Sequence, residues 1–238
     1  MFLTANNQLK KKWLIWGGAI VAILVILGFA GLDKILYMLI HNPACDIWYM
    51  GGGFLCSFAF IIGKVFSAKI WLVLTGVLLL VVLIKRFVIS IEKNKSIKSK
   101  FNPIAIARDV IKSVRTNNAF LVFSSVLCAV VTTGVLKFFV GRMRPVFFDG
   151  LGVTGFNPFS FEWAFNSMPS GHAAATFAGL VMLGMLTPQW KPLTWTVAII
   201  VGISRVYIGA HWPTDVLVGA FIGMVAADLV KHWAFKRK

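Results

Sequence analysis

The sequence predicts an all-α, polytopic membrane protein with six transmembrane helices and one further segment, near 47–63, that lies in the interface or re-enters the membrane. Hydrophobic residues make up 58% of the 238 residues and charged residues only 13%, which is about half the charged share of a soluble domain. Several uncharged stretches approach or exceed the roughly 18 residues that a bilayer core requires. We expect one integral-membrane domain over residues 1–238.

The first expected span, Trp13 to Leu32, is uncharged and follows the lysines at 10–12. A cleaved signal peptide is the alternative, but the apolar run is long for one and no small-residue cleavage site follows it. We therefore expect an uncleaved span. Gly and Pro residues punctuate the ends of five further spans, which are Ile70 to about Ile89, Thr116 to about Val140, His172 to about Trp190, Pro192 to Ala210, and Pro213 to His232.

The distribution of basic residues predicts the orientation of these spans. With six spans, the amino terminus, the segment Lys85 to Arg115, the turn at Lys191 and the tail from Lys231 lie on one side and hold 17 of the 24 basic residues. Basic loops face the cytoplasm. A seventh span at Ile47 to Gly63 would export one of the basic segments, so this Gly-rich segment is assigned to the interface or to a re-entrant hairpin.

The net charge of +16 is explained by this orientation, because the basic residues flank the apolar runs. We expect no nucleic-acid partner. The three cysteines show neither metal-like spacing nor a disulfide framework, and Cys56 and Cys128 are interpreted as packing residues within apolar runs.

A first polar cluster follows the third span, in the stretch from Lys137 to Pro145. Lys137 and Arg144 are seven residues apart, close to two helical turns, and are expected to project from nearly the same face. Arg142 points elsewhere and is interpreted as a cation that snorkels to the interface. Ionisable groups at membrane depth are costly and tend to be functional.

A second cluster, Pro169-Ser170-Gly171-His172, stands directly before an apolar run. Ser170 is suited to cap a helix, and the free amides of a helix start attract anions. An alternative is that Ser170 only caps and that His172 lies at the level of the headgroups.

The third cluster runs from Ser204 to Asp215 and contains Arg205 and His211. A carboxylate near one imidazole nitrogen fixes the tautomer and raises basicity, which frees the other nitrogen to act as base or nucleophile. Asp215 also suits the first turn of a helix that starts at Pro213. All three clusters emerge on the same, non-cytoplasmic face and together suit transfer of a phosphoryl group.

In order, these clusters read Lys-x6-Arg-Pro, Pro-Ser-Gly-His and Ser-Arg-x5-His-x3-Asp. This pattern resembles the tripartite signature of the type 2 phosphatidic acid phosphatase superfamily without a departure at any signature position. The match extends over residues 137–215, about a third of the chain, and six spans are similar to the integral-membrane branch of the family.

The resemblance implies roles for eight residues. His211 would attack phosphorus and form a phosphohistidine, with Asp215 orienting it, and His172 would protonate the leaving oxygen and activate water. The phosphate would be bound by a set of cations and polar groups, which are Lys137, Arg144, Ser170, Gly171 and Arg205. No metal or other cofactor is expected, because these cations neutralise the phosphate.

The expected substrate is a membrane lipid phosphate at the periplasmic face of a bacterial inner membrane. Lipid A phosphate is favoured, since the sequence is loosely similar to lipid A phosphatases; undecaprenyl pyrophosphate, phosphatidylglycerophosphate and phosphatidic acid are alternatives. Seven aromatic residues between Val146 and Met168 either admit a lipid sideways or form an interfacial belt. The competing functions are an anion transporter, a lipid phosphotransferase and, less compatible with six spans, a vanadium haloperoxidase.

Overall fold

The regular structure of the protein is helical throughout the residues that the computed structural model describes, namely 2–4, 6–45, 53–96 and 103–236. Two isolated bridges, Leu3 with Leu9 and Arg142 with Phe156, are the exceptions in these ranges. The helices are α1 (Lys11–Leu27), α2 (Asp33–Ile40), α3 (Phe54–Val65), α4 (Ala68–Ser96), α5 (Pro103–Val114), α6 (Asn118–Val140), α7 (Pro145–Leu151), α8 (Gly171–Leu186), α9 (Lys191–Tyr207) and α10 (Pro213–Phe235).

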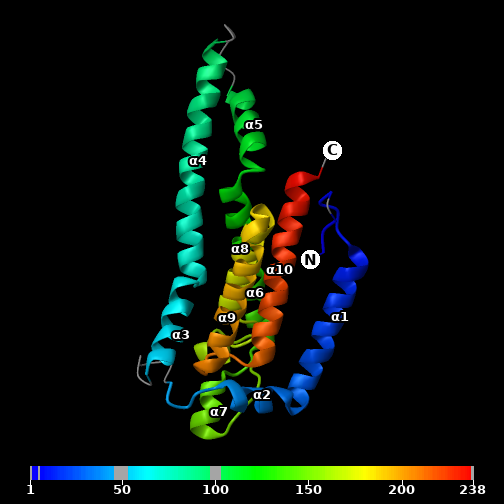
Figure 1. The fold of residues 1–238 in the computed structure, drawn as a ribbon, viewed down its shortest axis with the longest axis vertical. Coiled ribbons are helices and arrows are strands. Elements are labelled where there is room, and N and C mark those ends of the chain that lie inside the picture. The colour runs from blue at the N-terminus through cyan, green and yellow to red at the C-terminus, as the bar shows by residue number, and fades with distance from the viewer. Residues whose placement is uncertain (1, 5, 46–52, 97–102, 237–238) are drawn as a thin grey trace.

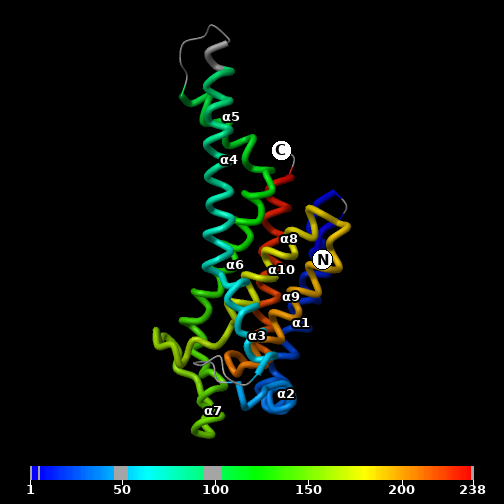
Figure 2. The backbone as a smooth tube through the Cα atoms, turned by 60° about the vertical axis from the view of Figure 1, so that its left-hand side comes forward, coloured from blue at the N-terminus to red at the C-terminus, as the bar shows by residue number. Residues whose placement is uncertain are grey.

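The helices are arranged along one long axis with distinct ends (Figures 1 and 2). The start of α1, the end of α4, the start of α5 and the end of α10 lie toward one end, whereas α2 and α7 lie at the other. The basic segments of the sequence therefore gather at one end, as the predicted orientation requires.

The lengths of the helices refine the predicted spans. Four apolar helical runs are long enough to cross a membrane, namely Lys11–Ile40, Phe54–Lys93, Asn118–Val140 and Pro213–Phe235. Helices α8 and α9 have 16 and 17 residues, so each is about 25 Å long, shorter than a hydrocarbon core of about 30 Å. The all-helical membrane class is confirmed, whereas the count of six full-length spans is not.

The segment predicted to lie in the interface or re-enter the membrane is described in part. Its residues 47–52 lie outside the described residues. The rest forms α3, which leads into α4 after a two-residue break at Phe66 and Ser67. The described part is thus a 12-residue helix at the start of the second apolar run, and its placement in the interface or as a re-entrant element stays a prediction.

A sharp bend separates α1 from α2 and sends α2 across the end of the bundle (Figure 1). The bend is a π-helical turn, Gly28–Leu32, in which Gly31 has a φ of 125°, a conformation that favours glycine. The bend places Asp33, the first residue of α2, in a buried position. This acidic residue becomes important at the functional site.

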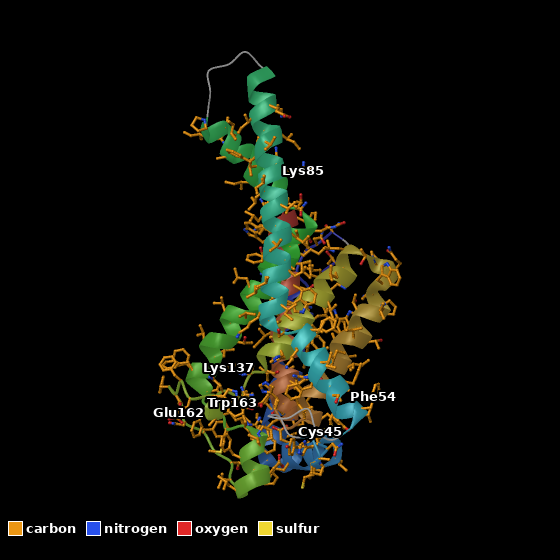
Figure 3. The ribbon with its side chains drawn as sticks, turned by 90° about the vertical axis from the view of Figure 1, so that its left-hand side faces the viewer. Cys45, Phe54, Lys85, Lys137, Glu162 and Trp163 are labelled. Carbon is orange, nitrogen blue, oxygen red and sulfur yellow. A yellow bond between two sulfur atoms is a disulfide. The ribbon has the colours of Figure 1, made fainter. Side chains whose placement is uncertain are left out.

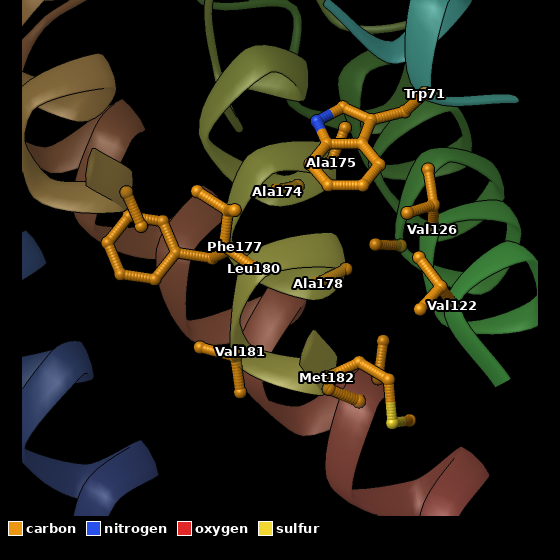
Figure 4. Packing of buried hydrophobic residues seen from close by; sticks show 14 of the residues in the cluster. Trp71, Val122, Val126, Ala174, Ala175, Phe177, Ala178, Leu180, Val181 and Met182 are labelled. Carbon is orange, nitrogen blue, oxygen red and sulfur yellow. The ribbon is translucent and has the colours of Figure 1, made fainter. Parts of the chain in front are cut away.

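Helix α8 is the centre of the packed core. Its buried side chains include Ala174, Ala175 and Ala178, and Trp71 of α4 and Val126 of α6 pack around them (Figure 4). A Cβ atom on Gly219 of α10 would lie 2.4 Å from the Ser170 carbonyl oxygen. Small residues thus let the backbones approach closely, which is how helices associate within membranes.

The cysteines depart from the sequence interpretation. Cys45 and Cys56 form a disulfide across a separation of 11 residues, and Cys128 is free and exposed on α6. The predicted absence of a disulfide was wrong. Of the two cysteines interpreted as packing residues, Cys56 is buried in a hydrophobic cluster but disulfide-bonded, and Cys128 is exposed rather than packed. Spacing alone could not reveal the disulfide, because the chain between Cys45 and Cys56 must fold back before their side chains can meet.

Candidate active site

The three sequence clusters meet at a single cavity of about 590 Å³. Six of the eight predicted site residues line it: Lys137, Arg144, Gly171, His172, Arg205 and His211. Ser170 and Asp215 lie directly behind this wall and are fully buried. The cavity is near the end of the molecule that carries Cys45 and Trp163, far from Lys85 on the upper part of α4 (Figure 3).

The first cluster reaches the cavity at the end of α6. The seven-residue spacing predicted two continuous helical turns from Lys137 to Arg144, but the helix ends between them. Helix α6 ends at Val140, and Gly141 adopts a left-handed conformation with a φ of 57°. A Cβ atom there would lie 1.9 Å from the Asn157 carbonyl oxygen. Lys137 is therefore helical and Arg144 is not, but both donate hydrogen bonds to the Asn166 carbonyl oxygen.

Arg144 is held in a fixed orientation by backbone acceptors. Its Nε donates to the Trp163 carbonyl oxygen at 3.0 Å and its Nη1 to the Ala210 carbonyl oxygen at 2.9 Å. The guanidinium also lies 4.4 Å from the centroid of the Trp163 ring, a cation–π contact. Burial lowers the pKa of Arg144 to about 10, so its side chain remains charged at neutral pH.

The second cluster forms the amino-terminal end of α8. Ser170 is the N-cap residue, and its Oγ accepts a hydrogen bond from the Ala173 amide at 3.4 Å. Its own amide donates to the Asp215 carbonyl oxygen at 2.8 Å. Gly171 and His172 line the cavity, which places the start of a helix, with its affinity for anions, beside the cations.

His211 and Asp215 form the pair that the sequence predicted. His211 Nδ1 lies 3.8 Å from Asp215 Oδ2, longer than a hydrogen bond, and this buried nitrogen has no other partner among the described residues. Catalytic hydrogen bonds are often long without substrate and tighten when it binds. With Nδ1 turned to the carboxylate, Nε2 is the nitrogen available for attack.

Burial also lowers the pKa of His211 well below its ordinary value. Asp215 opposes this effect, whereas the positive charges of Arg144 and Lys137 add to it. His211 therefore remains neutral, with a free lone pair, at and below neutral pH. A nucleophile requires this protonation state.

A buried network behind the cavity holds Asp215 in place. Arg142 is only 7% exposed; its Nη1 donates to Asp215 Oδ1 at 2.8 Å and its Nη2 to Asp33 Oδ2 at 2.7 Å. The Thr214 amide donates to Asp33 Oδ1 at 2.9 Å, and Ser167 Oγ donates to Asp215 Oδ2. The interpretation of Arg142 as a snorkelling cation was wrong, because two carboxylates from distant segments surround it. One sequence signal could have indicated this: Asp33 is an acidic residue that directly follows an apolar span.

The Arg205 side chain lies against α3, a helix outside the three signature clusters, and reaches the cavity there. Its Nη2 donates to the Ala59 carbonyl oxygen and, at 3.0 Å, to Ser204 Oγ. A Cβ atom on Gly63 would lie 1.9 to 2.1 Å from three atoms of the Arg205 guanidinium. The absence of a side chain at Gly63 is therefore what leaves room for Arg205.

The aromatic stretch of residues 146–168 divides among three places. Trp163 lines the cavity, whereas Phe159 and Phe161 are exposed and stack against Phe138 of α6. Phe159 and Phe161 thus form an outer aromatic surface, Phe148 packs against the buried Trp212, and Trp163 is the aromatic residue of this stretch that contributes to the cavity.

The wall of the cavity is cationic, with His172 and His211 as its titratable bases. Among the described residues, no group of three or more His, Cys, Asp or Glu side chains is placed to hold a metal ion. Asp215 already accepts hydrogen bonds from the Trp212 amide at 2.9 Å and from Arg142. The donor set thus fits an anion.

The fold and the site together define a helical membrane protein with a cationic cavity in which a histidine faces a buried carboxylate. The chain belongs to the PAP2 superfamily, whose family model matches residues 118–238. The matched part contains all three signature clusters.

Relatives with named functions match about half of the chain. A lipid A 1-phosphatase from Rhizobium etli is 37% identical over 101 residues, which cover 42% of this chain and 44% of the relative. An undecaprenyl-diphosphatase from Sulfolobus acidocaldarius is 32% identical and covers 51% and 57%, respectively. A phosphatidylglycerophosphatase B from Bacillus subtilis is also 32% identical, over 44% and 52%. The chain thus spans about half the length of these relatives.

A similar solved structure extends the likeness over most of the chain. The crystal structure of Aquifex aeolicus LpxE aligns with a TM-score of 0.52 and 21% identity over 84% of this chain and 94% of that one. At this identity the match concerns the fold. It includes helices of the amino-terminal half, because the carboxy-terminal half alone could not account for 84% of the residues.

Proposed function

We propose that the protein is a metal-independent lipid phosphatase that hydrolyses a phosphate ester of a membrane lipid at the periplasmic face through a phosphohistidine, with lipid A phosphate as the favoured substrate. The observation that carries this proposal is the convergence of Lys137, His172, Arg205 and His211, from three separate segments of the sequence, on one cavity. Lipid A 1-phosphatases from Rhizobium etli and Rhizobium johnstonii are among the relatives, which supports the choice of substrate.

In the first step, the phosphate dianion binds among Lys137, Arg144 and Arg205 and the amides at the start of α8. Their positive charges are fixed before the substrate arrives, which favours the negatively charged transition state. His211 Nε2 attacks phosphorus as the bond to the lipid oxygen breaks, and His172 gives its proton to that oxygen. The products are a phosphohistidine and a lipid with a free hydroxyl group.

In the second step, water replaces the lipid. His172, now neutral, takes a proton from the water, whose oxygen attacks phosphorus while the bond to His211 breaks. The positive charge that develops on His211 during the first step is stabilised by Asp215, which Arg142 and Ser167 hold in place. Inorganic phosphate leaves, and His211 returns to its neutral form.

The proposed periplasmic face rests on two features at opposite ends of the molecule. Basic side chains such as Lys85 mark the end far from the cavity, whereas the disulfided Cys45 lies at the cavity end (Figure 3). Disulfides persist in oxidising compartments, which include the bacterial periplasm, and basic segments face the cytoplasm. Both features support an active site on the outer side of an inner membrane.

The test is phosphate release by the detergent-purified protein from four lipids: lipid A, undecaprenyl pyrophosphate, phosphatidylglycerophosphate and phosphatidic acid. We expect release to be fastest from lipid A, to survive EDTA and to be inhibited by vanadate. Acid quenching of a reaction with labelled substrate should trap the phosphohistidine. Binding of these lipids without phosphate release would instead identify an anion carrier, and loss of turnover in EDTA that magnesium restores would contradict the metal-independent scheme.

A further inference from the structure

One part of the cavity wall lies outside the signature clusters and comes from the junction of α3 and α4. This junction contributes five lining residues, namely Phe60, Lys64, Ser67, Ala68 and Lys69. They lie outside the matched family region, 118–238. The carbonyl oxygen of Phe66, at the break itself, accepts a hydrogen bond from Thr176 Oγ1 of α8 at 3.1 Å, so the junction is fastened to the helix that carries His172.

Two of these residues, Lys64 and Lys69, add positive charge to the cavity. Both side chains are exposed, and within the described residues neither forms an ion pair with a carboxylate. Lys64 Nζ lies 5.3 Å from the centroid of the Phe60 ring. Arg142, by contrast, has both of its terminal nitrogens occupied by carboxylates. The charges of Lys64 and Lys69 are thus available to a ligand in the cavity.

The two lysines adjoin the site that binds the scissile phosphate. Lys64 directly follows Gly63, whose backbone is in contact with the Arg205 guanidinium. The cavity thus has one set of cations from the signature clusters and a second set from the α3–α4 junction. A single phosphate dianion is already neutralised by Lys137, Arg144 and Arg205, and a cavity of about 590 Å³ has room for a second charged group.

We propose that Lys64 and Lys69 form a second anion subsite, which binds a second phosphate group next to the scissile one in the substrate. This inference rests on the proposed phosphatase function and deepens it, because it adds lipids with two neighbouring phosphates to the substrates that the cavity binds, beside the favoured lipid A phosphate. The second phosphate is either linked directly to the scissile one, as in a lipid diphosphate, or separated from it by a short alcohol. No bond to this group changes; the subsite contributes binding.

The experiment compares the wild-type protein with Lys64→Gln/Lys69→Gln on three lipids. Undecaprenyl pyrophosphate has directly linked phosphates, phosphatidylglycerophosphate has them on either side of a glycerol, and phosphatidic acid has one phosphate. We expect KM to rise about tenfold for one or both two-phosphate lipids, as expected when a charge-assisted hydrogen bond is lost, and to stay within about twofold for phosphatidic acid. The lipid whose KM rises identifies the spacing that the subsite accepts.

A matched control, Lys85→Gln/Arg86→Gln, removes two charges from the same apolar run outside the cavity and should leave all three KM values unchanged. Equal changes for phosphatidic acid and the two-phosphate lipids, or no change for any of them, would overturn the subsite. Activity of the wild-type protein on phosphatidic acid distinguishes this failure from failure of the phosphatase function itself, which would appear as no release from any lipid.

Discussion

The two halves of the molecule contribute differently to the same site. Residues 118–236 form most of the packed core, to which α4 adds Trp71, and they hold the signature clusters. Of an 18-residue apolar stretch of α10, 44% is buried. In the amino-terminal half, only 6% of an 18-residue apolar stretch is buried in each of the two apolar runs, Lys11–Ile40 and Phe54–Lys93. This half nevertheless supplies Asp33, Ala59 and Gly63, which contact Arg142 and Arg205. The comparison shows that the reacting groups belong to one half, whereas several groups that orient them belong to the other.

The largest expected effect tests the carboxy-terminal half alone. Replacement of His211 with Ala removes the nucleophile and should lower kcat about 10⁴-fold or more, with an unchanged melting temperature. His232→Ala is the control, because this histidine lies near the end of α10 and contacts Asn7. On the acid side of the pH profile of the wild-type protein, kcat/KM should begin to fall only below about pH 6.5, the ordinary pKa of histidine, because burial lowers the pKa of His211. Substantial turnover by His211→Ala would remove the assignment of the nucleophile.

A smaller effect tests whether the amino-terminal half orients the phosphate-binding arginine. In Gly63→Ala, the new methyl group would occupy the space of the Arg205 guanidinium, and we expect kcat/KM to fall about 100-fold, the loss typical of one transition-state donor. The matched control is Gly134→Ala in α6, where a Cβ atom meets nothing within 4 Å. If both variants retain wild-type activity, α3 does not position Arg205.

The next prediction concerns the support of Asp215. Asp33→Asn weakens the ion pair with Arg142 and should lower kcat about tenfold while KM stays nearly constant, because Asp33 does not touch the substrate. Asp109→Asn is the control; its ion pair with Lys93 spans 3.8 Å and is exposed. A purely structural role for Asp33 would lower the melting temperature and leave kcat unchanged at temperatures where the protein is folded.

The smallest effect on activity is expected at the disulfide. Cys45→Ser removes a link that closes a segment of 11 residues, which corresponds to about 3 kcal/mol of stability in the chain-entropy model. The free energy of unfolding should fall by this amount, whereas kcat should change little because neither cysteine lines the cavity. Cys128→Ser, at the free and exposed cysteine, should change neither. Equal stability of the two variants would show that the disulfide does not fasten the amino-terminal half.

The sequence by itself determined the helical membrane class, the grouping of basic segments at one end and the eight residues that come together at the cavity. It could do so because these depend on composition and on spacing within short segments: an apolar run forms a helix wherever it lies in a bilayer, and Pro169 to His172 suits a helix start locally. His211 and Asp215, four residues apart, likewise meet through local structure.

Only the tertiary structure decided which distant groups support the residues at the cavity. Arg142 meets Asp33 across 109 residues, and Arg205 meets Ala59 across 146. The disulfide between Cys45 and Cys56 and the place of Lys64 and Lys69 on the cavity wall also depend on how α3 packs against the core. Such contacts follow from the packing of whole helices, in which small residues such as Gly63 set the distance of approach, and periodicity within one segment carries no information about its distant partners.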